Sequence, residues 1–170
     1  EAAEIAAGLL PGRARRFAFE KLASFDEAAW RKLRENRTAT PPASGLRFHG
    51  SDRDAGAVRM SRANAARASV AGLTEFTQTA VDELTCPSGP AGLVIVNPPY
   101  GDRIGDRSQL KSLYRTLGHT LLTRCSGWRV GLVTSDADLA RATGLPFLPS
   151  GPPVLHGGLR ITLYRTAPLD

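Results

Sequence analysis

The sequence is poor in cysteine and has no long apolar run. Its two cysteines, Cys86 and Cys125, lie 39 residues apart, with no Cys-x-x-Cys pair and no cluster of histidines nearby. The longest apolar run, from Ala91 to Val96, is too short to cross a bilayer, and no basic-then-apolar signal segment opens the chain. These absences exclude a disulfide scaffold and a transmembrane helix. They also argue against a zinc site or any other metal site, and they favour a cytoplasmic, reducing setting.

The composition is that of an ordinary globular domain with a basic bias. With 170 residues, 42% apolar and 22% charged, the chain is slightly longer than one typical domain and can bury a core without staples. The net charge of +6 comes mainly from arginine and favours a polyanionic partner such as nucleic acid. A GC-rich codon bias would leave the same excess of arginine, so the charge alone does not settle the partner.

The first third of the chain has helical patterns separated by loops. Residues 1–9 are rich in alanine and predict a helix that stops at Pro11. Ser24 and Glu27 have the spacing of a capping box, which predicts a helix over residues 25–37 with Trp30 and Leu33 on its buried side. The loop between the two helices carries three basic residues, which could contact phosphate or simply face solvent: Arg13, Arg15 and Arg16.

From residue 46 onward, strand patterns alternate with helix patterns. Strands are predicted over 46–50, 75–79, 93–96 and 130–134, and a two-strand hairpin around Gly157 closes the chain. Helices are predicted over 54–72, from Ser108 through an amphipathic stripe of leucines that includes Tyr114, and over 135–143. Leu93 to Val96 is an uninterrupted run that predicts a central strand buried on both faces. The alternation predicts an α/β fold with a mostly parallel sheet and an antiparallel C-terminal hairpin.

The segment Asn97-Pro98-Pro99-Tyr100, directly after the expected central strand, carries the sharpest chemical signal. An amide oxygen of Asn97 and the carbonyl of Pro98 could each accept one N–H of an exocyclic base amine. They would thereby stabilise the positive charge that develops on the nitrogen during substitution. The prolines stiffen the segment, and Tyr100 could stack on the base. A base in a duplex cannot reach such a pocket, so it must be unpaired or flipped out.

Acidic residues follow the first expected strand. At this edge of an α/β sheet, where ligands bind, a carboxylate is a natural acceptor for the two hydroxyls of a ribose. Asp52 and Asp54 both lie here, and Asp54 is placed to cap the next helix.

Asp52, followed 45 residues later by Asn97-Pro98-Pro99-Tyr100, resembles the class I S-adenosylmethionine-dependent amino-methyltransferases. The longer string from Asn97 to Gly105, the segment from Gly12 to Lys21 and the late Gly157-Gly158-Leu159 narrow the likeness. Together they resemble the catalytic domain of the large-subunit ribosomal RNA guanine-N2 methyltransferase family, whose members are also described as N6-adenine-specific DNA methylases. The resemblance covers nearly the whole chain and implies a Rossmann-like methyltransferase sheet.

The resemblance implies S-adenosyl-L-methionine as cofactor and suggests the residues that hold it. Asp52 would bind the ribose, Arg53 would lie near the adenine, and Asn97 would border the cofactor as well as the base. The family has an acid near position 80 that meets the adenine, whereas this chain has Ala80 there. Asp82 is the nearest acid that could substitute for it.

The resemblance also implies the site of the target base. Asn97, Pro98, Pro99 and Tyr100 would hold it, as catalytic residues, with Tyr100 also binding substrate. Arg103 would lie near the pocket mouth and could meet a phosphate, although a salt bridge to a neighbouring aspartate explains it equally well.

One part of the family's domain has no counterpart in this chain. The family's first strand and the Gly-rich loop that cradles the methionine of the cofactor precede a helix that begins like Glu1-Ala2-Ala3. We therefore expect residues 1–170 to be an N-terminally truncated methyltransferase catalytic domain. In the family, an RNA-binding THUMP domain can lie further upstream.

These patterns predict a cytoplasmic S-adenosylmethionine-dependent methyltransferase that acts on a base amine, above all guanine N2 of large-subunit ribosomal RNA. An N6-adenine DNA methyltransferase could use the same pocket. An enzyme acting on protein glutamine also shares the Asn-Pro-Pro-Tyr segment, but the Gly-Asp-Arg-Ile-Gly string that follows argues against it. The missing loop and Ala80 leave open a nucleic-acid-binding module without activity.

Overall fold

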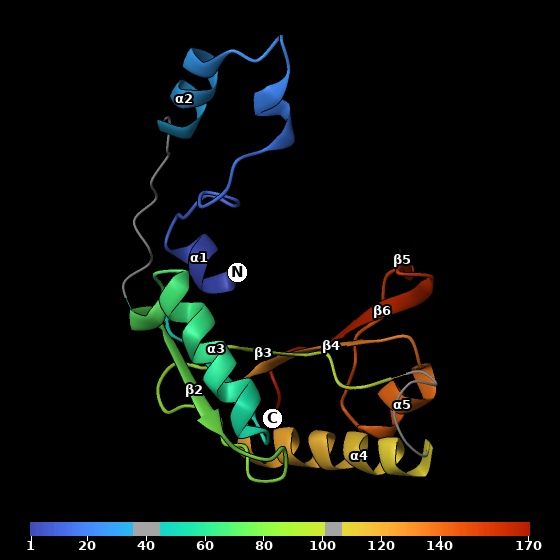
Figure 1. Ribbon diagram of the computed structural model, residues 1–170. Coiled ribbons are helices and arrows are strands. Elements are labelled where there is room, and N and C mark those ends of the chain that lie inside the picture. The colour runs from blue at the N-terminus through green and yellow to red at the C-terminus, as the bar shows by residue number, and fades with distance from the viewer. Residues whose placement is uncertain (36–44, 101–106) are drawn as a thin grey trace. The chain divides into compact units, whose positions relative to one another are not determined.

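The computed structural model describes residues 1–35, 45–100 and 107–170, which form two compact units (Figure 1). The first unit runs from Glu1 to Gln78 and the second from Thr79 to Asp170. Each unit has its own sheet and its own cluster of buried side chains.

The first unit is built around a β–α–β arrangement. Its strands β1 (Phe48–Asp52) and β2 (Thr74–Gln78) pair in parallel, so that Asp52 lies opposite Gln78. Both strands lie within one or two residues of their predicted positions. The remaining elements of this unit are α1 (Ala2–Ala6), η1 (Ala18–Lys21), α2 (Glu27–Glu35), α3 (Ala55–Arg67) and η2 (Ala71–Leu73).

Helix α3 begins as predicted but ends earlier. The side chain of Asp54 accepts hydrogen bonds from the backbone N–H groups of Gly56 and Ala57, which confirms its predicted capping role. The helix ends at Arg67 and not at Gly72, because Ser69 takes the left-handed conformation (φ 58°) that ends the helical turn. The prediction that the helix ends at Gly72 was therefore wrong.

Helix α2 differs from its prediction at both its start and its buried side. Asp26, and not Ser24, caps the helix, because the Asp26 carboxylate accepts a 2.9 Å hydrogen bond from the Ala29 N–H. No residue of α2 is buried, and Leu33 is 67% exposed while Trp30 is half-buried. The predicted end of this helix and the loop after it lie outside the described residues.

The second unit has a four-stranded sheet in the order β3-β4-β6-β5. β3 (Leu93–Val96) pairs with β4 (Arg129–Thr134) in parallel, whereas β6 (Leu159–Arg165) pairs antiparallel with both β4 and β5 (Val154–His156). Its helices are α4 (Arg107–Arg124) and α5 (Ala137–Ala142). The fold is thus mixed α/β with partly parallel pairing and antiparallel C-terminal strands.

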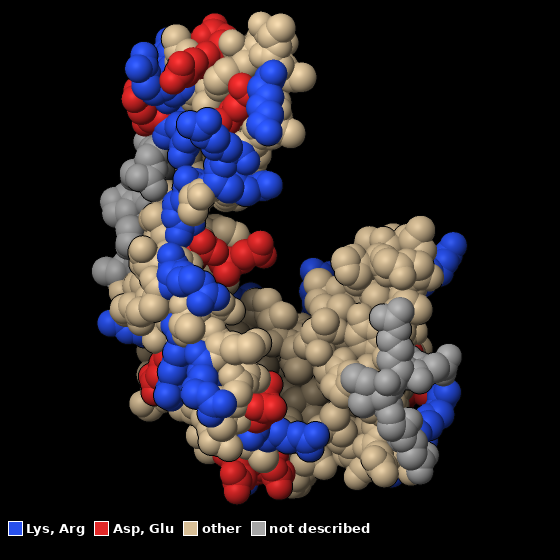
Figure 2. Space-filling model, viewed as in Figure 1, with Lys and Arg blue, Asp and Glu red and all other residues tan. Residues whose placement is uncertain are grey.

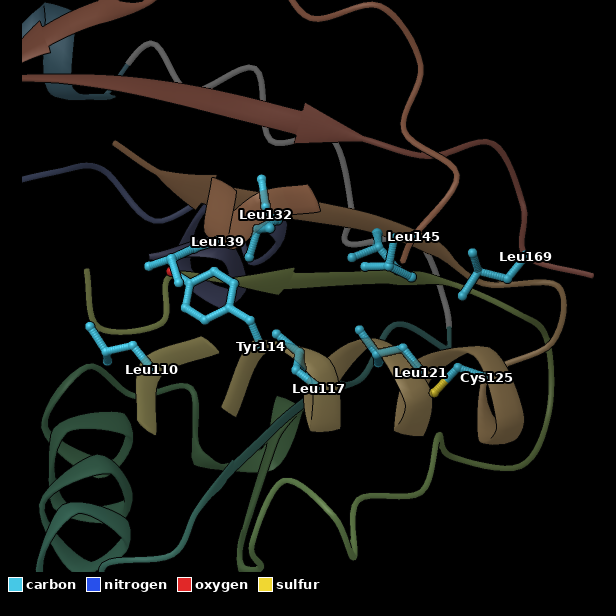
Figure 3. Packing of buried hydrophobic residues seen from close by; sticks show 11 residues of the cluster. Leu110, Tyr114, Leu117, Leu121, Cys125, Leu132, Leu139, Leu145 and Leu169 are labelled. Atoms are coloured by element: carbon cyan, nitrogen blue, oxygen red, sulfur yellow. The ribbon is translucent and has the colours of Figure 1, made fainter. Parts of the chain in front are cut away.

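The core of the second unit lies between α4 and β4 (Figure 3). The predicted leucine stripe of α4 faces inward, and Tyr114 and Leu121 have no exposed surface. Val130 and Leu132 of β4 are equally buried. Burying a side chain of this size typically contributes about 1.5–3 kcal/mol, so this contact organises the unit.

The predicted central strand is exposed on one side. Within the described residues, β3 pairs only with β4, and its alternate residues Leu93 and Ile95 are 54% and 70% exposed. Val94 and Val96 pack against the core on the other face. The prediction of burial on both faces was therefore wrong, because among the described residues no strand pairs with the second edge of β3 and the side chains around Leu93 and Ile95 leave them largely exposed.

The two cysteines form a disulfide, which corrects the reduced pair that the sequence favoured. The sulfur atoms of Cys86 and Cys125 are 2.13 Å apart, joining the loop before β3 to the end of α4. A separation of 39 residues carries no information about spatial distance, and only the packing of this loop against α4 brings the pair together.

The described parts of the chain contain neither a cluster of metal-binding side chains nor a helix that could span a membrane. No group of three or more His, Cys, Asp or Glu side chains among them is arranged to hold a metal ion. No helix in these ranges is both long enough and apolar enough to span a membrane.

The contact between α4 and α5 allows a test of the packing. A Cβ added at Gly118 in α4 would lie 1.8 Å from the backbone carbonyl oxygen of Thr143, which cannot rotate away. We expect Gly118→Ala to reduce the free energy of unfolding by about 1–3 kcal/mol or more, measured by urea denaturation. Gly151→Ala is the matched control, since nothing lies within 4 Å of its added Cβ. Equal stability of the two variants would contradict the described packing.

Candidate active site

The segment Asn97 to Tyr100 leaves β3 at its carboxyl end, as predicted. Asn97 is exposed, Pro98 is buried, and Tyr100 is half-buried against the core of the second unit. The side-chain amide of Asn97 is therefore available to a ligand while the residue after it is anchored.

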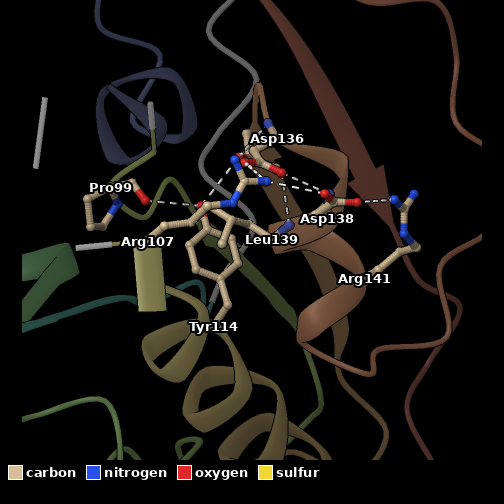
Figure 4. A network of polar contacts seen from close by, with 8 residues as sticks. Pro99, Arg107, Tyr114, Asp136, Asp138, Leu139 and Arg141 are labelled. Atoms are coloured by element: carbon tan, nitrogen blue, oxygen red, sulfur yellow. Dashed lines mark hydrogen bonds and ion pairs between the residues drawn. The ribbon is translucent and has the colours of Figure 1, made fainter. Parts of the chain in front are cut away.

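Tyr114 of α4 holds this segment from beneath (Figure 4). Its hydroxyl donates to the carbonyl oxygen of Pro99 at 3.3 Å and lies 3.3 Å from the hydroxyl oxygen of Thr134. Burial raises the pKa of the Tyr114 hydroxyl, which therefore keeps its proton at neutral pH. The Pro99 carbonyl is thus engaged with Tyr114, whereas Pro98 is buried and the acceptor role expected for its carbonyl stays a prediction.

Sequence reasoning gave Tyr114 no role at the site and placed it only in the apolar stripe. The one available signal was a polar hydroxyl among the leucines of that stripe, which must find a partner once it is buried. The partner lies 15 residues away in sequence, and only the folded structure reveals it.

A polar network lies beside this segment, at the carboxyl end of β4. The carboxylate of Asp136 caps α5 by accepting from the N–H groups of Asp138 and Leu139, and the N–H of Asp136 donates to the Thr134 hydroxyl. Arg107 at the start of α4 forms ion pairs with Asp136 at 3.3 Å and Asp138 at 3.2 Å, and Arg141 also pairs with Asp138. The network joins the beginnings of α4 and α5, the helices that frame the Asn97 segment.

The predicted ribose acceptor lies in the first unit. Asp52 is the last residue of β1 and is exposed, and one of its carboxylate oxygens accepts the Asp54 N–H at 2.8 Å. Arg53 is also exposed, and its carbonyl accepts a 3.1 Å hydrogen bond from the side-chain amide of Gln78. The carboxyl ends of both strands are thereby joined, and an exposed carboxylate lies at the edge where α/β sheets bind ligands.

Asp82 borders an open pocket of about 320 Å³ on the surface of the second unit. The other side chains that line it come from the outer surface of α4: Arg115, Thr116, His119, Thr120, Thr123 and Arg124. Asp82 thus lies among basic and hydroxyl groups of α4. Arg103, the last of the predicted site residues, lies outside the described residues.

Two acceptors and an aromatic ring follow one another directly in the Asn97 segment. Such a group can receive the two N–H bonds of an amine while the ring covers its base, with nothing in the set that would act as a covalent nucleophile. The geometry suits transfer of a group to a base amine.

Comparison with known proteins identifies the family of the chain. Residues 1–146 match the family described as RMKL-like, methyltransferase domain, and the chain belongs to that family. It is 34% identical over 172 aligned residues to the ribosomal RNA large subunit methyltransferase K/L of Marinomonas sp. (strain MWYL1). That alignment covers 97% of this chain but only 24% of the relative, so the chain spans about a quarter of that protein.

Solved structures show the same fold. The protein SMU.472, in complex with SAH, superposes with a TM-score of 0.86 at 26% identity, covering 99% of this chain and 44% of that one. A predicted N6-adenine-specific DNA methylase from Listeria monocytogenes str. 4b F2365 gives a TM-score of 0.79 at 26% identity, covering 96% of this chain and 42% of that one. The expected relationship to both groups of methyltransferases is confirmed.

The role of Tyr114 can be tested through stability. We expect Tyr114→Phe to lose about 1 kcal/mol of unfolding free energy, because the Pro99 carbonyl loses its donor. The folded state raises the pKa of this hydroxyl, so ionisation favours unfolding as the pH rises above about 10. Wild-type stability should therefore fall above that pH, and Tyr114→Phe should show a smaller fall. Identical pH profiles would contradict the buried hydroxyl.

Proposed function

We propose that the protein uses S-adenosyl-L-methionine to methylate an exocyclic base amine, most of all guanine N2 in large-subunit ribosomal RNA. The observation that carries the proposal is the Asn97 segment at the end of β3, held by the Tyr114 hydroxyl. Membership of a methyltransferase domain family and the ribosomal RNA methyltransferase name of the relative support it.

The residues present suit part of the cofactor. Asp52 offers an exposed carboxylate that could accept the ribose hydroxyls, with Arg53 beside it, and a charge-assisted hydrogen bond of this kind contributes about 1.5–3 kcal/mol. When bound, the cofactor supplies a methyl group activated by its positive sulfur. Asp82, our sequence candidate for the adenine, lies beside α4, and Ala80 provides no acid.

The chain's own residues act on the target amine. The side-chain oxygen of Asn97 and the carbonyl of Pro98 accept its two N–H bonds and favour the positive charge that develops on nitrogen. Tyr100 covers the base. Tyr114 keeps the segment in place, so the acceptors stay aimed at the nitrogen without reorganisation.

The principal competing function is N6-adenine methylation of DNA, because the Listeria structure carries that name. The same two acceptors would serve an adenine amine. A module that binds nucleic acid without methylating it is the non-enzymatic alternative, and Ala80 favours it.

We expect Asn97→Ala in the full-length protein to reduce methyl transfer by about 10²–10³-fold, the usual effect of removing one oriented group of this kind. The measurement uses labelled cofactor with ribosomal RNA and, separately, with DNA, followed by nucleoside analysis. Methylated guanine from RNA supports the proposal, and N6-methyladenine from DNA would replace it with the alternative.

Asn64→Ala is the matched control, since Asn64 is an exposed residue on α3 that bonds to Arg67. It should retain wild-type turnover. If Asn97→Ala also retained it, the segment would be no more than a rigid turn.

We further propose that the natural domain has additional strand pairing at the second edge of β1 and at the second edge of β3. Two observations support this: β1 pairs only with β2, and β3 only with β4, within the described residues. A further observation is the exposed apolar face of this sheet, where Ile95 of β3 is 70% exposed and Leu163 of β6 is 49% exposed. Both side chains neighbour Gly131 of β4, which lies between them. Residues 1–170 would then be a truncated catalytic domain, lacking the loop whose backbone N–H groups approach the cofactor.

This proposal predicts a difference in cofactor binding between two lengths of chain. Residues 1–170 alone should bind S-adenosylmethionine weakly, whereas a chain extended upstream by about 30 residues, enough for a strand and its loop, should bind it tightly. Isothermal titration of both measures this. Equally tight binding by the two chains would show that Glu1-Ala2-Ala3 does not align with the start of the family's first helix.

A ribosomal RNA substrate places the protein in the cytoplasm, with an RNA-binding domain such as THUMP upstream as a further expectation. Thiols are kept reduced in that compartment. The disulfide between Cys86 and Cys125 is an observation against this compartment.

A further inference from the structure

We propose that residues 15–34, here called the aromatic–basic segment, bind a single-stranded stretch of the RNA. The segment includes η1 and α2 and lies wholly in the first unit. The inference rests on the proposed RNA substrate and adds a second contact to it, separate from the Asn97 segment.

The aromatic side chains of this segment form a small cluster of their own. The rings of Phe17 and Phe19 stack with centroids 5.4 Å apart and an interplanar angle of 19°. Trp30 meets both edge-on, at 5.7 and 5.0 Å, and Phe25 lies 6.0 Å from Phe19. Four of the eleven aromatic residues of the chain are thus gathered in twenty residues.

This cluster is only partly covered. Phe19 is 40% exposed, and the apolar side chains of Leu22 and Leu33 are 60% and 67% exposed. Helix α2 has no buried residue. A core-forming cluster would bury these side chains, so the exposed apolar surface indicates a binding surface.

Positive charge surrounds the cluster. The segment has six basic residues and three acidic ones, which supplies half of the net charge of the chain. Figure 2 shows blue side chains bordering tan surface over this part of the molecule, with red ones among them. Two of the acids serve the backbone: Glu20 accepts the Phe17 N–H at 3.0 Å, and Asp26 caps α2.

The basic side chains of the segment could meet phosphate, although the guanidinium of Arg34 already donates a 3.2 Å hydrogen bond to the carbonyl oxygen of Arg13. Within the parts of the chain that the structure describes, none of the six forms an ion pair. The guanidinium of Arg15 stacks on Phe17 at 4.5 Å, and that of Arg34 lies 5.9 Å from the ring centre of Trp30. Arg13, just outside the segment, is by contrast engaged, because it pairs with Glu4 and donates to the Ala68 carbonyl.

Aromatic rings with guanidinium groups stacked on them, bordered by unpaired cations, are the combination that binds single strands. Bases stack on the rings, whereas the cations follow the phosphates. A protein partner of ordinary composition would leave the positive charge uncompensated. The sequence left open whether the arginines of this loop contact phosphate or face solvent. Arg13 instead holds parts of the first unit together, whereas Arg15 and Arg16 belong to the proposed binding surface.

The test measures binding of a labelled 12-nucleotide single-stranded RNA to the protein by fluorescence anisotropy, without cofactor. Phe19→Ala should weaken binding by about five- to 150-fold, the range for loss of one stacked base. Phe19→Leu keeps an apolar side chain without the ring and should bind as weakly, whereas Phe19→Tyr keeps the ring and its contacts and should bind like the wild type. Weak binding by Phe19→Leu together with wild-type binding by Phe19→Tyr would assign the effect to the aromatic ring.

The charges are tested through the salt dependence. Arg16→Ala combined with Lys32→Ala should reduce the slope of log affinity against log salt by about 1.4, because each phosphate contact on a single strand contributes about 0.7. Arg129→Ala combined with Arg160→Ala, two exposed residues of the second unit, is the matched control and should leave the slope unchanged.

A spectroscopic signal locates the contact. With Trp128→Phe, Trp30 is the only tryptophan in these 170 residues, and RNA should quench its fluorescence. Unchanged emission, or wild-type affinity of the Phe19→Leu and Arg16/Lys32 variants, would overturn the proposal, as would tighter binding of DNA of the same sequence. Methyl transfer is measured separately, so its failure with RNA binding intact would reject the enzyme and not this surface.

Discussion

The candidate site depends on the packing of α4 against β4. A stripe of leucines spaced along α4 covers one face of the strands, and the same face of the helix carries the hydroxyl of Tyr114 into the core. A buried hydroxyl must be hydrogen-bonded, and this one lies 3.3 Å from both the Pro99 carbonyl and the Thr134 hydroxyl. The same apolar contact that stabilises the second unit therefore holds the segment that would meet the target base.

The polar groups at the edge of this core connect β4, α5 and α4 to one another. Thr134 receives the N–H of Asp136, and Asp136 both caps α5 and pairs with Arg107 at the start of α4. Each interaction is modest, since exposed ion pairs contribute about 0–1 kcal/mol. Together they join the ends of two helices and one strand around the Asn97 segment, so rigidity at the site is shared among several contacts.

Much of the fold was predictable because helices and strands have different hydrophobic periods. The leucine stripe of α4, the buried strand β4 and the terminal hairpin all lie close to their predicted ranges. The predictions were wrong where one local sequence pattern is compatible with more than one structure. Ser24 and Asp26 both suit a helix cap, and four apolar residues in β3 do not show whether another strand will pair with its second edge.

The chemical content of the protein can be read from its residues alone: the acceptors of the Asn97 segment, the carboxylate of Asp52, the amphipathic α4 and the excess of arginine. These follow from residue type and short-range spacing, which act within a few residues of one another. Which distant groups meet is known only from the folded chain, as for Tyr114 with Pro99, Cys86 with Cys125 and the clustered rings of residues 15–34. Those contacts depend on how whole elements pack, because chain separation does not specify distance once the chain is folded.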